Sequence, residues 1–149
     1  MKKIIVLLLI AAICLLSFVG CGKKEKANFE FYYEIANTQY SGGEVIELTA
    51  YIKNISGKII TYTGSSGDFF PWIELYCVDA DGKVICTIEH DAIPFSTDVV
   101  EKWIKDGSVG SKTYYFTIPE DAACGVYSIR LSHSGESCVF DGVLEIVEK

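Results

Sequence analysis

Apolar residues recur at every second position through most of this 149-residue chain, and this alternation restricts the fold more than any other feature. A period of two gives each segment one apolar and one wet face, as an antiparallel strand with one buried side requires. The apolar faces predicted to be buried are Phe29, Phe31, Tyr33 and Ile35; Ile46, Leu48, Ala50 and Ile52; Ile73, Leu75 and Cys77; Val84, Cys86 and Ile88; Tyr114, Phe116 and Ile118; Tyr127, Ile129 and Leu131; and Phe140, Leu144 and Ile146. A further β-branched run extends from Lys58 to Thr63.

Turn-forming residues separate these segments. The turn signals are Ser41-Gly42-Gly43, Asn54-Ile55-Ser56-Gly57, Ser65-Ser66-Gly67-Asp68, Asp81-Gly82 and Ser134-Gly135. About eight short strands separated in this way predict an all-β fold, namely an immunoglobulin-like antiparallel β-sandwich.

One segment departs from the alternation and predicts a short helix from Asp98 to Asp106. Asp98 and Glu101 have the spacing of a capping box. The apolar stripe at i, i+3 and i+4 consists of Val100, Trp103 and Ile104. Gly107 supplies a stop signal, so we expect one helix laid over an edge or end of the sandwich.

The N-terminal segment has the pattern of an export signal. A basic start is followed by an apolar run from Ile4 to Val19 and then by Gly20-Cys21. A run of about sixteen residues is short for a spanning helix, which needs ~20, although an uncleaved anchor is the alternative. Phe18-Val19-Gly20-Cys21 resembles the lipobox of bacterial lipoproteins. The resemblance implies that Cys21 is diacylated and holds the chain at the extracytoplasmic face of the cell membrane.

These features divide the chain into a signal peptide (1–20), an acylated cysteine with a short tether (21–27) and one domain (28–149). The six tether residues that follow Cys21 reach at most ~20 Å, so the domain is expected close to the lipid. The basic residues of the tether are Lys23, Lys24 and Lys26. They favour an anionic lipid surface, or they merely keep the tether solvated.

The charge of the chain excludes nucleic acid as a partner. The net charge is −7, from 13 basic and 20 acidic residues, and loss of Lys2 and Lys3 with the signal peptide makes it −9. Affinity for nucleic acid comes from lysines and arginines that neutralise phosphates, and an acidic domain lacks that surplus. We therefore expect two partners, the membrane through the lipid anchor and a protein of unknown identity.

Two cysteines flank the hairpin around Asp81-Gly82. If these two residues form a type I′ turn, Cys77 lies opposite Cys86, with Cα atoms ~4.5 Å apart and within disulfide range. If Gly82 instead follows a type I turn as a bulge, Cys77 lies opposite Ile85. The sequence leaves open a Cys77–Cys86 disulfide or two buried thiols that pack as small hydrophobes.

The other cysteines are not expected to pair. Ser134-Gly135 predicts the turn between the last two strands, which puts Cys138 near Leu131 and Cys124 at the far end of its strand. Seven strand residues separate the two by ~23 Å. The chain also lacks a Cys-x-x-Cys pair and the cysteine–histidine spacing of a zinc site.

Candidate catalytic and metal sites are weak throughout. Asp79, Asp81 and Gly82 resemble part of a calcium loop, but the twelfth position of an EF-hand would be Ile88, so a turn is the better interpretation. Glu89-His90-Asp91 fits a solvated loop after a strand. No nucleophile elbow or phosphate-binding loop occurs. We therefore expect no enzyme activity, no metal and no cofactor.

An aromatic run is the best candidate for binding. The residues of interest are Phe69, Phe70 and Trp72, with Tyr40, Tyr62 and Tyr76 expected outward or on loops. Loops carry binding residues more often than scaffolds do, and Trp and Tyr are favoured interface anchors. The run could contact protein or glycan, or it could simply pack the start of a strand.

The span from Val45 to Leu131 resembles the domain of the intracellular proteinase inhibitor (BsuPI) family. The residues that carry the resemblance are Ile52-Lys53-Asn54-Ile55-Ser56-Gly57-Lys58, Ser65-Ser66-Gly67-Asp68-Phe69, the hairpin Leu75 to Val84, and Gly125-Val126-Tyr127-Ser128-Ile129. The family implies a small β-sandwich and, for its named member, inhibition of a serine protease. This chain departs from it by the export signal and by the expected helix. We expect a membrane-anchored protein-binding module, with a protease inhibitor acting through Gly64 to Pro71 and a glycan-binding module as alternatives.

Overall fold

The computed structural model describes residues 27–65, 69–92 and 99–148. Within these residues the chain is all-β, with ten strands and no helix. The strands are β1 (Phe29–Ile35), β2 (Gln39–Ser41), β3 (Val45–Asn54), β4 (Ile60–Ser65), β5 (Trp72–Val78), β6 (Val84–Ile88), β7 (Val99–Ile104), β8 (Val109–Thr117), β9 (Gly125–His133) and β10 (Glu136–Val147). The predicted signal peptide and Cys21 lie outside the described residues. No described segment is a helix long and apolar enough to cross a bilayer.

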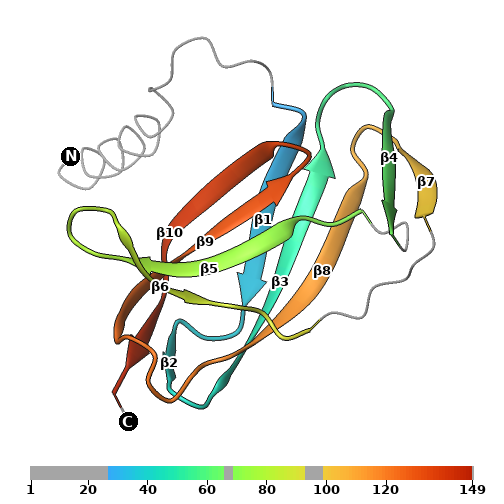
Figure 1. The fold of residues 1–149 in the computed structure, drawn as a ribbon. Helices are drawn as coiled ribbons and strands as arrows, with labels where there is room; N and C mark the ends of the chain where they lie inside the picture. The colour runs from blue at the N-terminus through green and yellow to red at the C-terminus, as the bar shows by residue number, and fades with distance from the viewer. Residues whose placement is uncertain (1–26, 66–68, 93–98, 149) are drawn as a thin grey trace, which may run out of the picture.

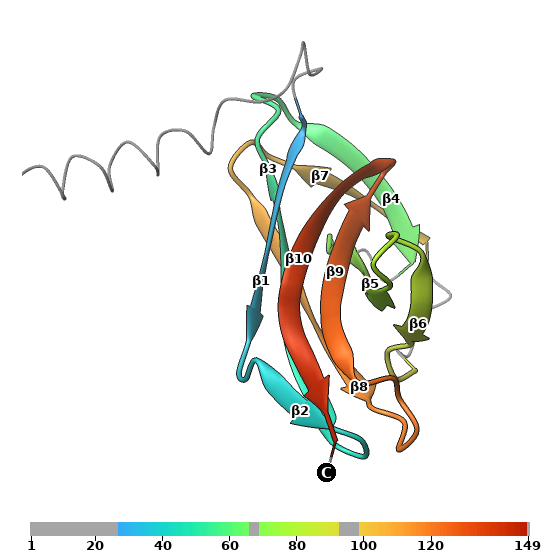
Figure 2. The same cartoon turned by 90° about the vertical axis from the view of Figure 1, so that its left-hand side faces the viewer.

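Two sheets pack face to face and a third, smaller one extends from their edge (Figures 1 and 2). One sheet has the order β1-β3-β8 and the other β2-β10-β9-β5-β6, while β4 and β7 form a two-stranded ribbon. All pairings are antiparallel except that between β2 and β10. The arrangement is sandwich-like, as the alternation predicts.

The core lies between the two main sheets. The fully or almost fully buried side chains of the main cluster include Ile46, Leu48, Ala50, Leu75, Tyr114, Phe116, Tyr127, Ile129 and Leu131. Each belongs to a predicted apolar face, so the prediction of which side of these strands faces the core is confirmed. A second cluster under the β4–β7 ribbon consists of Phe29, Ile52, Phe69 and Ile104. The domain therefore has one main core and one satellite core.

The expected helix from Asp98 to Asp106 is wrong. Residues Val99–Ile104 form β7, which pairs antiparallel with β4 from Ile60↔Ile104 to Ser65↔Val99. A six-residue strand gains its hydrogen bonds from a partner about forty residues away, which a local apolar stripe does not reveal. An isolated helix of this length is marginal in water, so the long-range pairing prevails.

The β5–β6 hairpin combines both predicted registers. The backbone N–H of Gly82 donates to the Asp79 carbonyl at 3.0 Å, and Gly82 has φ +80°, as in a type I turn followed by a glycine bulge. That turn alone would set Cys77 opposite Ile85. A register shift next to Cys77 leaves Ile85 as an extra residue, so Cys77 pairs with Cys86 after all.

Hydrogen bonds hold together the end of the sandwich at which β1 begins. The Asn28 carbonyl accepts from Ile55 N at 2.8 Å, and Glu136 accepts from the backbone N–H groups of Asn28 and Phe29. Asn54, the last residue of β3, is fully buried at this end of the sandwich. We call this end of the domain, formed by residues 27–28, 54–60, 103–109 and 134–136, the N-terminal end.

Candidate functional site

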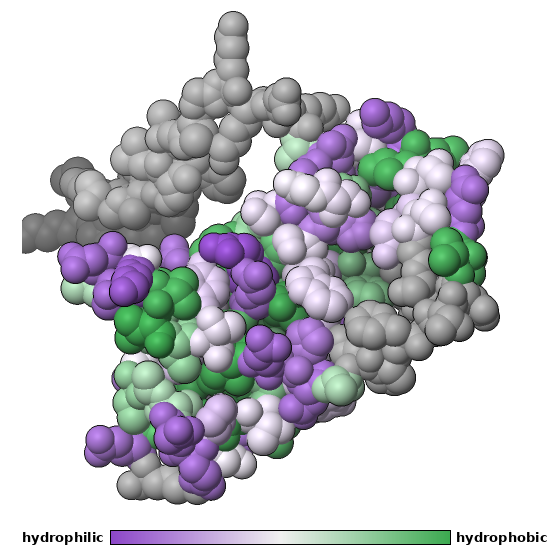
Figure 3. All heavy atoms as spheres, viewed as in Figure 1, coloured by the Kyte–Doolittle hydropathy of each residue, from purple (hydrophilic) through white to green (hydrophobic). Residues whose placement is uncertain are grey.

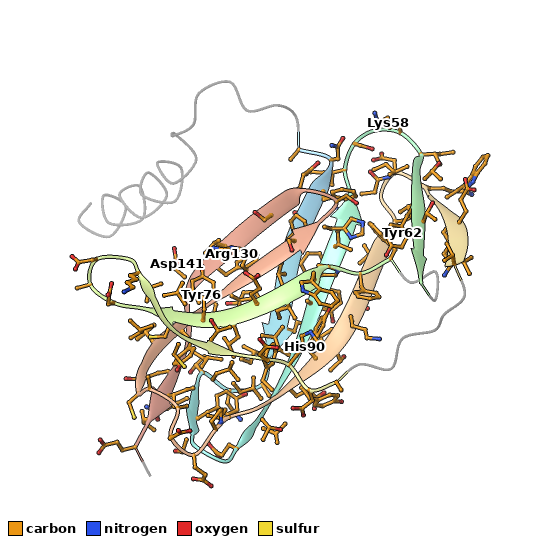
Figure 4. All side chains as sticks on the ribbon, in the orientation of Figure 1. Lys58, Tyr62, Tyr76, His90, Arg130 and Asp141 are labelled. Carbon is orange, nitrogen blue, oxygen red and sulfur yellow. The ribbon has the colours of Figure 1, made fainter. Side chains whose placement is uncertain are left out.

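The outer face of the five-stranded sheet presents an alternating row of polar and aromatic residues. On β5, Ile73, Leu75 and Cys77 face the core, so the intervening residues Trp72, Glu74 and Tyr76 lie on the opposite face. Their cross-strand partners on β9 are Ser132, Arg130 and Ser128. Figure 4 shows Tyr76 and Arg130 close together on neighbouring strands.

A groove of about 590 Å³ lies where this face meets the β9–β10 turn and the ribbon. It is lined by Tyr62, Phe70, Trp72, Arg130, Ser132, His133, Ser134, Gly135, Glu136 and Ser137. Three aromatic rings, one cation, one carboxylate and several hydroxyls thus converge on one concave surface. Its volume lies within the usual range of ligand sites, about 300–1,000 Å³.

Trp72 is the most exposed aromatic side chain of the groove, with 44% of its surface accessible. It begins β5 directly after Pro71, whose carbonyl accepts a hydrogen bond from the buried Tyr114 hydroxyl at 2.5 Å. The indole contacts the His90 ring edge-on, with centroids 5.5 Å apart. The indole is therefore held on a strand, with part of its surface exposed to solvent.

Arg130 is fixed in its place by two neighbours. Its guanidinium donates to the Glu74 carboxylate at 2.9 Å and lies 5.2 Å from the centre of the Tyr76 ring. The Arg130 and Glu74 side chains are partly exposed, so their ion pair orients Arg130 more than it stabilises the fold. Arg130 also lines a second hollow of about 270 Å³ beside it, so it connects the groove with the β5–β6 surface.

His133 forms the inner wall of the groove. Its ring lies 5.1–5.2 Å from the rings of Phe29, Tyr62 and Phe69, and its Nδ1 is 3.1 Å from the Phe70 carbonyl oxygen. Burial lowers the pKa of His133 below 6.5, against the opposing effects of the Phe70 carbonyl and Glu136. The imidazole is therefore neutral at pH 7 and serves as part of an aromatic wall.

The aromatic run predicted as a binding loop is divided by the structure. Trp72 and the half-buried Phe70 line the groove, and Lys112 lies 5.2 Å from the Phe70 ring. Phe69 is buried in the satellite core and does not reach the groove. Two of the tyrosines expected outward, Tyr40 and Tyr76, are also largely buried.

Sequence reasoning missed Arg130 and His133 as groove residues. Arg130 carried a signal, because it is the single arginine of the chain and lies on the wet side of its strand. His133 carried none, since its partners come from β1, β4 and the segment before β5. The strand order brings these segments together, and no local pattern encodes that order.

Cys77 and Cys86 lie directly opposite each other on β5 and β6. Burial, and then the neighbouring Cys86, raise the pKa of Cys77, so the thiol is less reactive than usual. Whether they form a disulfide stays a prediction. Cys138 pairs with Leu131 in the sheet and Cys124 precedes β9, so the separation predicted for these two agrees with the register.

The residues considered for catalysis do not converge. His90 contacts Trp72, Tyr114 and Phe116, and its Nδ1 faces the Asp91 carbonyl oxygen at 2.9 Å. Within the part of the chain that the structure describes, no group of three or more His, Cys, Asp or Glu side chains could hold a metal ion. The arrangement is suited to holding a partner against aromatic and charged groups.

Comparisons with known proteins assign no family. No protein-family model and no curated protein match the chain, so the resemblance to the BsuPI family stays a prediction. Among solved structures, a β-glucosidase from Listeria innocua in complex with isofagomine is 15% identical, with a TM-score of 0.43, over 85% of this chain and 17% of that one. Spo0M, a sporulation control protein from Bacillus subtilis, is 15% identical with a TM-score of 0.48, over 81% of this chain and 50% of that one. The chain thus spans half or less of these proteins.

Proposed function

We propose that this chain is a lipoprotein anchored at the extracytoplasmic face of the cell membrane, whose immunoglobulin-like sandwich binds a protein partner. The sequence around Cys21 supports the anchor. The Tyr127 hydroxyl supports the immunoglobulin-like assignment, because it donates to the Ala123 carbonyl four residues upstream at 2.9 Å, as in a tyrosine corner.

The observation that carries the binding proposal is the groove with Trp72 and Arg130 at its rim. Tryptophan, tyrosine and arginine dominate the energetics of protein interfaces when they stand in a partly desolvated hollow. Here Trp72, Tyr62 and Arg130 supply these three residue types, and all of them lie on strands. Binding should therefore cost little backbone conformational entropy. A protruding segment of a partner would fit the groove between them.

A capture experiment with a matched control tests this function. The acylated protein, Trp72→Ala and Trp103→Ala are each purified from envelopes after cross-linking. The two tryptophans are both exposed, but Trp103 lies outside the groove. We expect one protein to be captured by wild type and by Trp103→Ala and lost with Trp72→Ala. Equal capture by all three variants would refute binding through the groove.

Glycan binding is the second candidate, favoured by one observation. The exposed indole of Trp72 stands beside the hydroxyls of Ser132 and Ser137 and the charges of Arg130 and Glu136. An apolar ring next to hydrogen-bonding groups also suits a sugar. A glycan array probed with wild type and Trp72→Ala separates the candidates, because a blank array leaves the protein partner.

Protease inhibition has less support from the geometry. An inhibitory segment must present its side chains to a protease cleft, and the expected segment ran from Gly64 to Pro71. Phe69 and Pro71 are both buried. An inhibition assay against serine proteases at micromolar concentration tests this version, and absence of any effect would remove it.

A further inference from the structure

Large apolar side chains that do not line the groove are exposed at the N-terminal end of the domain. Trp103 has 70% of its surface accessible and Ile59 has 55%, and Ile55 and Val109 are also exposed. Figure 3 shows apolar surface in green over the region of β4 and β7, between paler and hydrophilic patches. A single exposed apolar side chain needs no special role, but several large ones at the same end of a domain indicate an interaction surface.

Backbone and side-chain hydrogen bonds connect the segments that carry these residues to the start of β1. Ile55 N donates to the Asn28 carbonyl, and Gly57 N donates to the Asp106 carboxylate at 3.0 Å. The Asn54 side-chain amide bridges the carbonyls of Lys58 and Ile104, next to Trp103. The apolar residues and the start of β1 therefore belong to one surface, on which Lys58 is labelled in Figure 4.

The charges of the domain are divided between its two ends. The N-terminal end and the strands beside it hold Lys53, Lys58, Lys102 and Lys105 together with Glu30, Glu101, Asp106 and Glu136. The opposite end, made of residues 36–47, 116–124 and 143–148, holds Glu44, Glu47, Glu120, Asp121, Glu145 and Glu148. In those three ranges no lysine or arginine occurs. The four lysines balance the four carboxylates at this end, so an anionic surface would repel it less than the opposite, purely acidic end.

We propose that the N-terminal end docks on an anionic lipid surface, with Trp103 and Ile59 entering the headgroup region and Lys58 and Lys105 contacting phosphates. Tryptophan is favoured at membrane interfaces, where its apolar ring and polar N–H are both satisfied. Each lysine near an anionic bilayer adds about fivefold to affinity. Both chemistries occur on the same surface.

The short segment between Cys21 and Asn28 indicates that lipid is what binds this surface. This inference rests on the proposed anchor at Cys21, from which six residues lead to Asn28. They span at most ~20 Å, so an acylated chain brings this end, and no other, next to the bilayer. Three tether lysines would add to the attraction. Docking would give the anchored domain a defined orientation on the bilayer.

The test uses a tether that does not depend on acylation. The mature chain from residue 21 contains all ten described strands and both core clusters. It carries a hexahistidine ahead of a Cys21→Ser change and is bound to vesicles through nickel-chelating lipid, with or without phosphatidylglycerol. Trp72→Phe leaves Trp103 as the single tryptophan, which is excited selectively over tyrosine at long wavelength, and Trp103→Phe leaves Trp72 as the internal control.

We expect Trp103 emission to shift to the blue and to be quenched by brominated lipid on phosphatidylglycerol vesicles, while Trp72 emission stays unchanged. Ile59→Ser should weaken the quenching, whereas Val45→Ser, an exposed valine at the opposite end, should not. For the chain without the tag, Lys58→Gln and Lys105→Gln should each lower vesicle affinity about fivefold.

Trp103 emission that remains as in solution, on vesicles to which the tagged chain is demonstrably bound, would overturn the docking surface. Equal quenching of both tryptophans would overturn it too, because the domain would then have no preferred orientation. Mass spectrometry of native Cys21 tests the anchor separately. A chain that lacks acyl groups but docks through the nickel tether would refute the anchor and retain the docking surface.

Discussion

Among single substitutions of polar residues in this domain, we expect substitution of Asn54 to lower the free energy of unfolding the most. Its side chain is fully buried and makes four hydrogen bonds. The amide donates to the carbonyls of Lys58 at 2.9 Å and Ile104 at 3.0 Å, and its oxygen accepts from the N–H and hydroxyl of Ser56 at 3.0 and 2.7 Å. One side chain thus joins β3, the loop before β4 and the end of β7.

Asn54→Ala removes all four bonds and leaves the buried Ile104 carbonyl without its donor. Each bond contributes about 0.5–1.5 kcal/mol net, and an unsatisfied buried group costs about 1–3 kcal/mol. Water can replace the partners on the more exposed Ser56 side, so we expect a loss of about 3 kcal/mol in the free energy of unfolding. For a domain of this size the melting temperature should fall by roughly 10 °C.

Chemical denaturation followed by circular dichroism measures this loss. Ser56→Ala is the matched control, because it removes the hydroxyl contacts and leaves both amide donations in place; its cost should stay below about 1 kcal/mol. If Asn54→Ala unfolds within about 1 kcal/mol of wild type, or no more readily than Ser56→Ala, the inference that Asn54 joins these three segments is wrong.

Three further outcomes are expected. Gly110→Ala should destabilise the domain by more than about 3 kcal/mol in the same assay, since a Cβ there would lie 1.7 Å from the Phe69 carbonyl oxygen. Gly135→Ala is the control, because its Cβ would meet no atom within 4 Å and the substitution should cost only the strain of its positive φ. The pKa of His133 is lower in the folded than in the unfolded chain, so the unfolded chain binds more protons. The contribution of His133 to the free energy of unfolding should therefore be full above pH 6.5 and fall as the pH drops below it. His133→Phe should flatten that dependence, as measured by denaturation curves at about pH 7.5 and 5.5. Tyr127→Phe should lower the free energy of unfolding by about 1 kcal/mol through loss of the bond to Ala123, and an unchanged midpoint would contradict a structural role for that hydroxyl.

The strand faces could be predicted because burial is written directly into the alternation. Ile46, Leu48, Ala50 and Ile52 are all fully buried on β3, as a period of two requires. β7 could not be predicted in this way. Its partner β4 lies about forty residues upstream, and Val100, Trp103 and Ile104 fit a helical stripe as well as they fit a strand, so only the pairing itself decides between the two.

The candidate site was predicted less completely than the fold. Trp72 was recognised because it belongs to an aromatic run at a predicted loop and because tryptophan is a favoured interface anchor. The placement of Phe69 depends on Phe29 and Tyr62 from other strands, whose rings lie 6.0 and 6.4 Å from its own. The hairpin shows the same limit, since the extra residue Ile85 restores a cysteine pairing that the turn type alone would have prevented.

The pairing of β1 with β3 also determines how the domain responds to mechanical load. Seven antiparallel pairs, from Phe29↔Asn54 to Ile35↔Leu48, connect β1 to the middle strand of its sheet. A pull on residue 28 along the direction of β1 would load these pairs in parallel, by shear, and would not unzip them one at a time. The carboxylate of Glu136 would share that force through its bonds to Asn28 and Phe29. The domain is thus built to resist extension from the end at which its tether would attach.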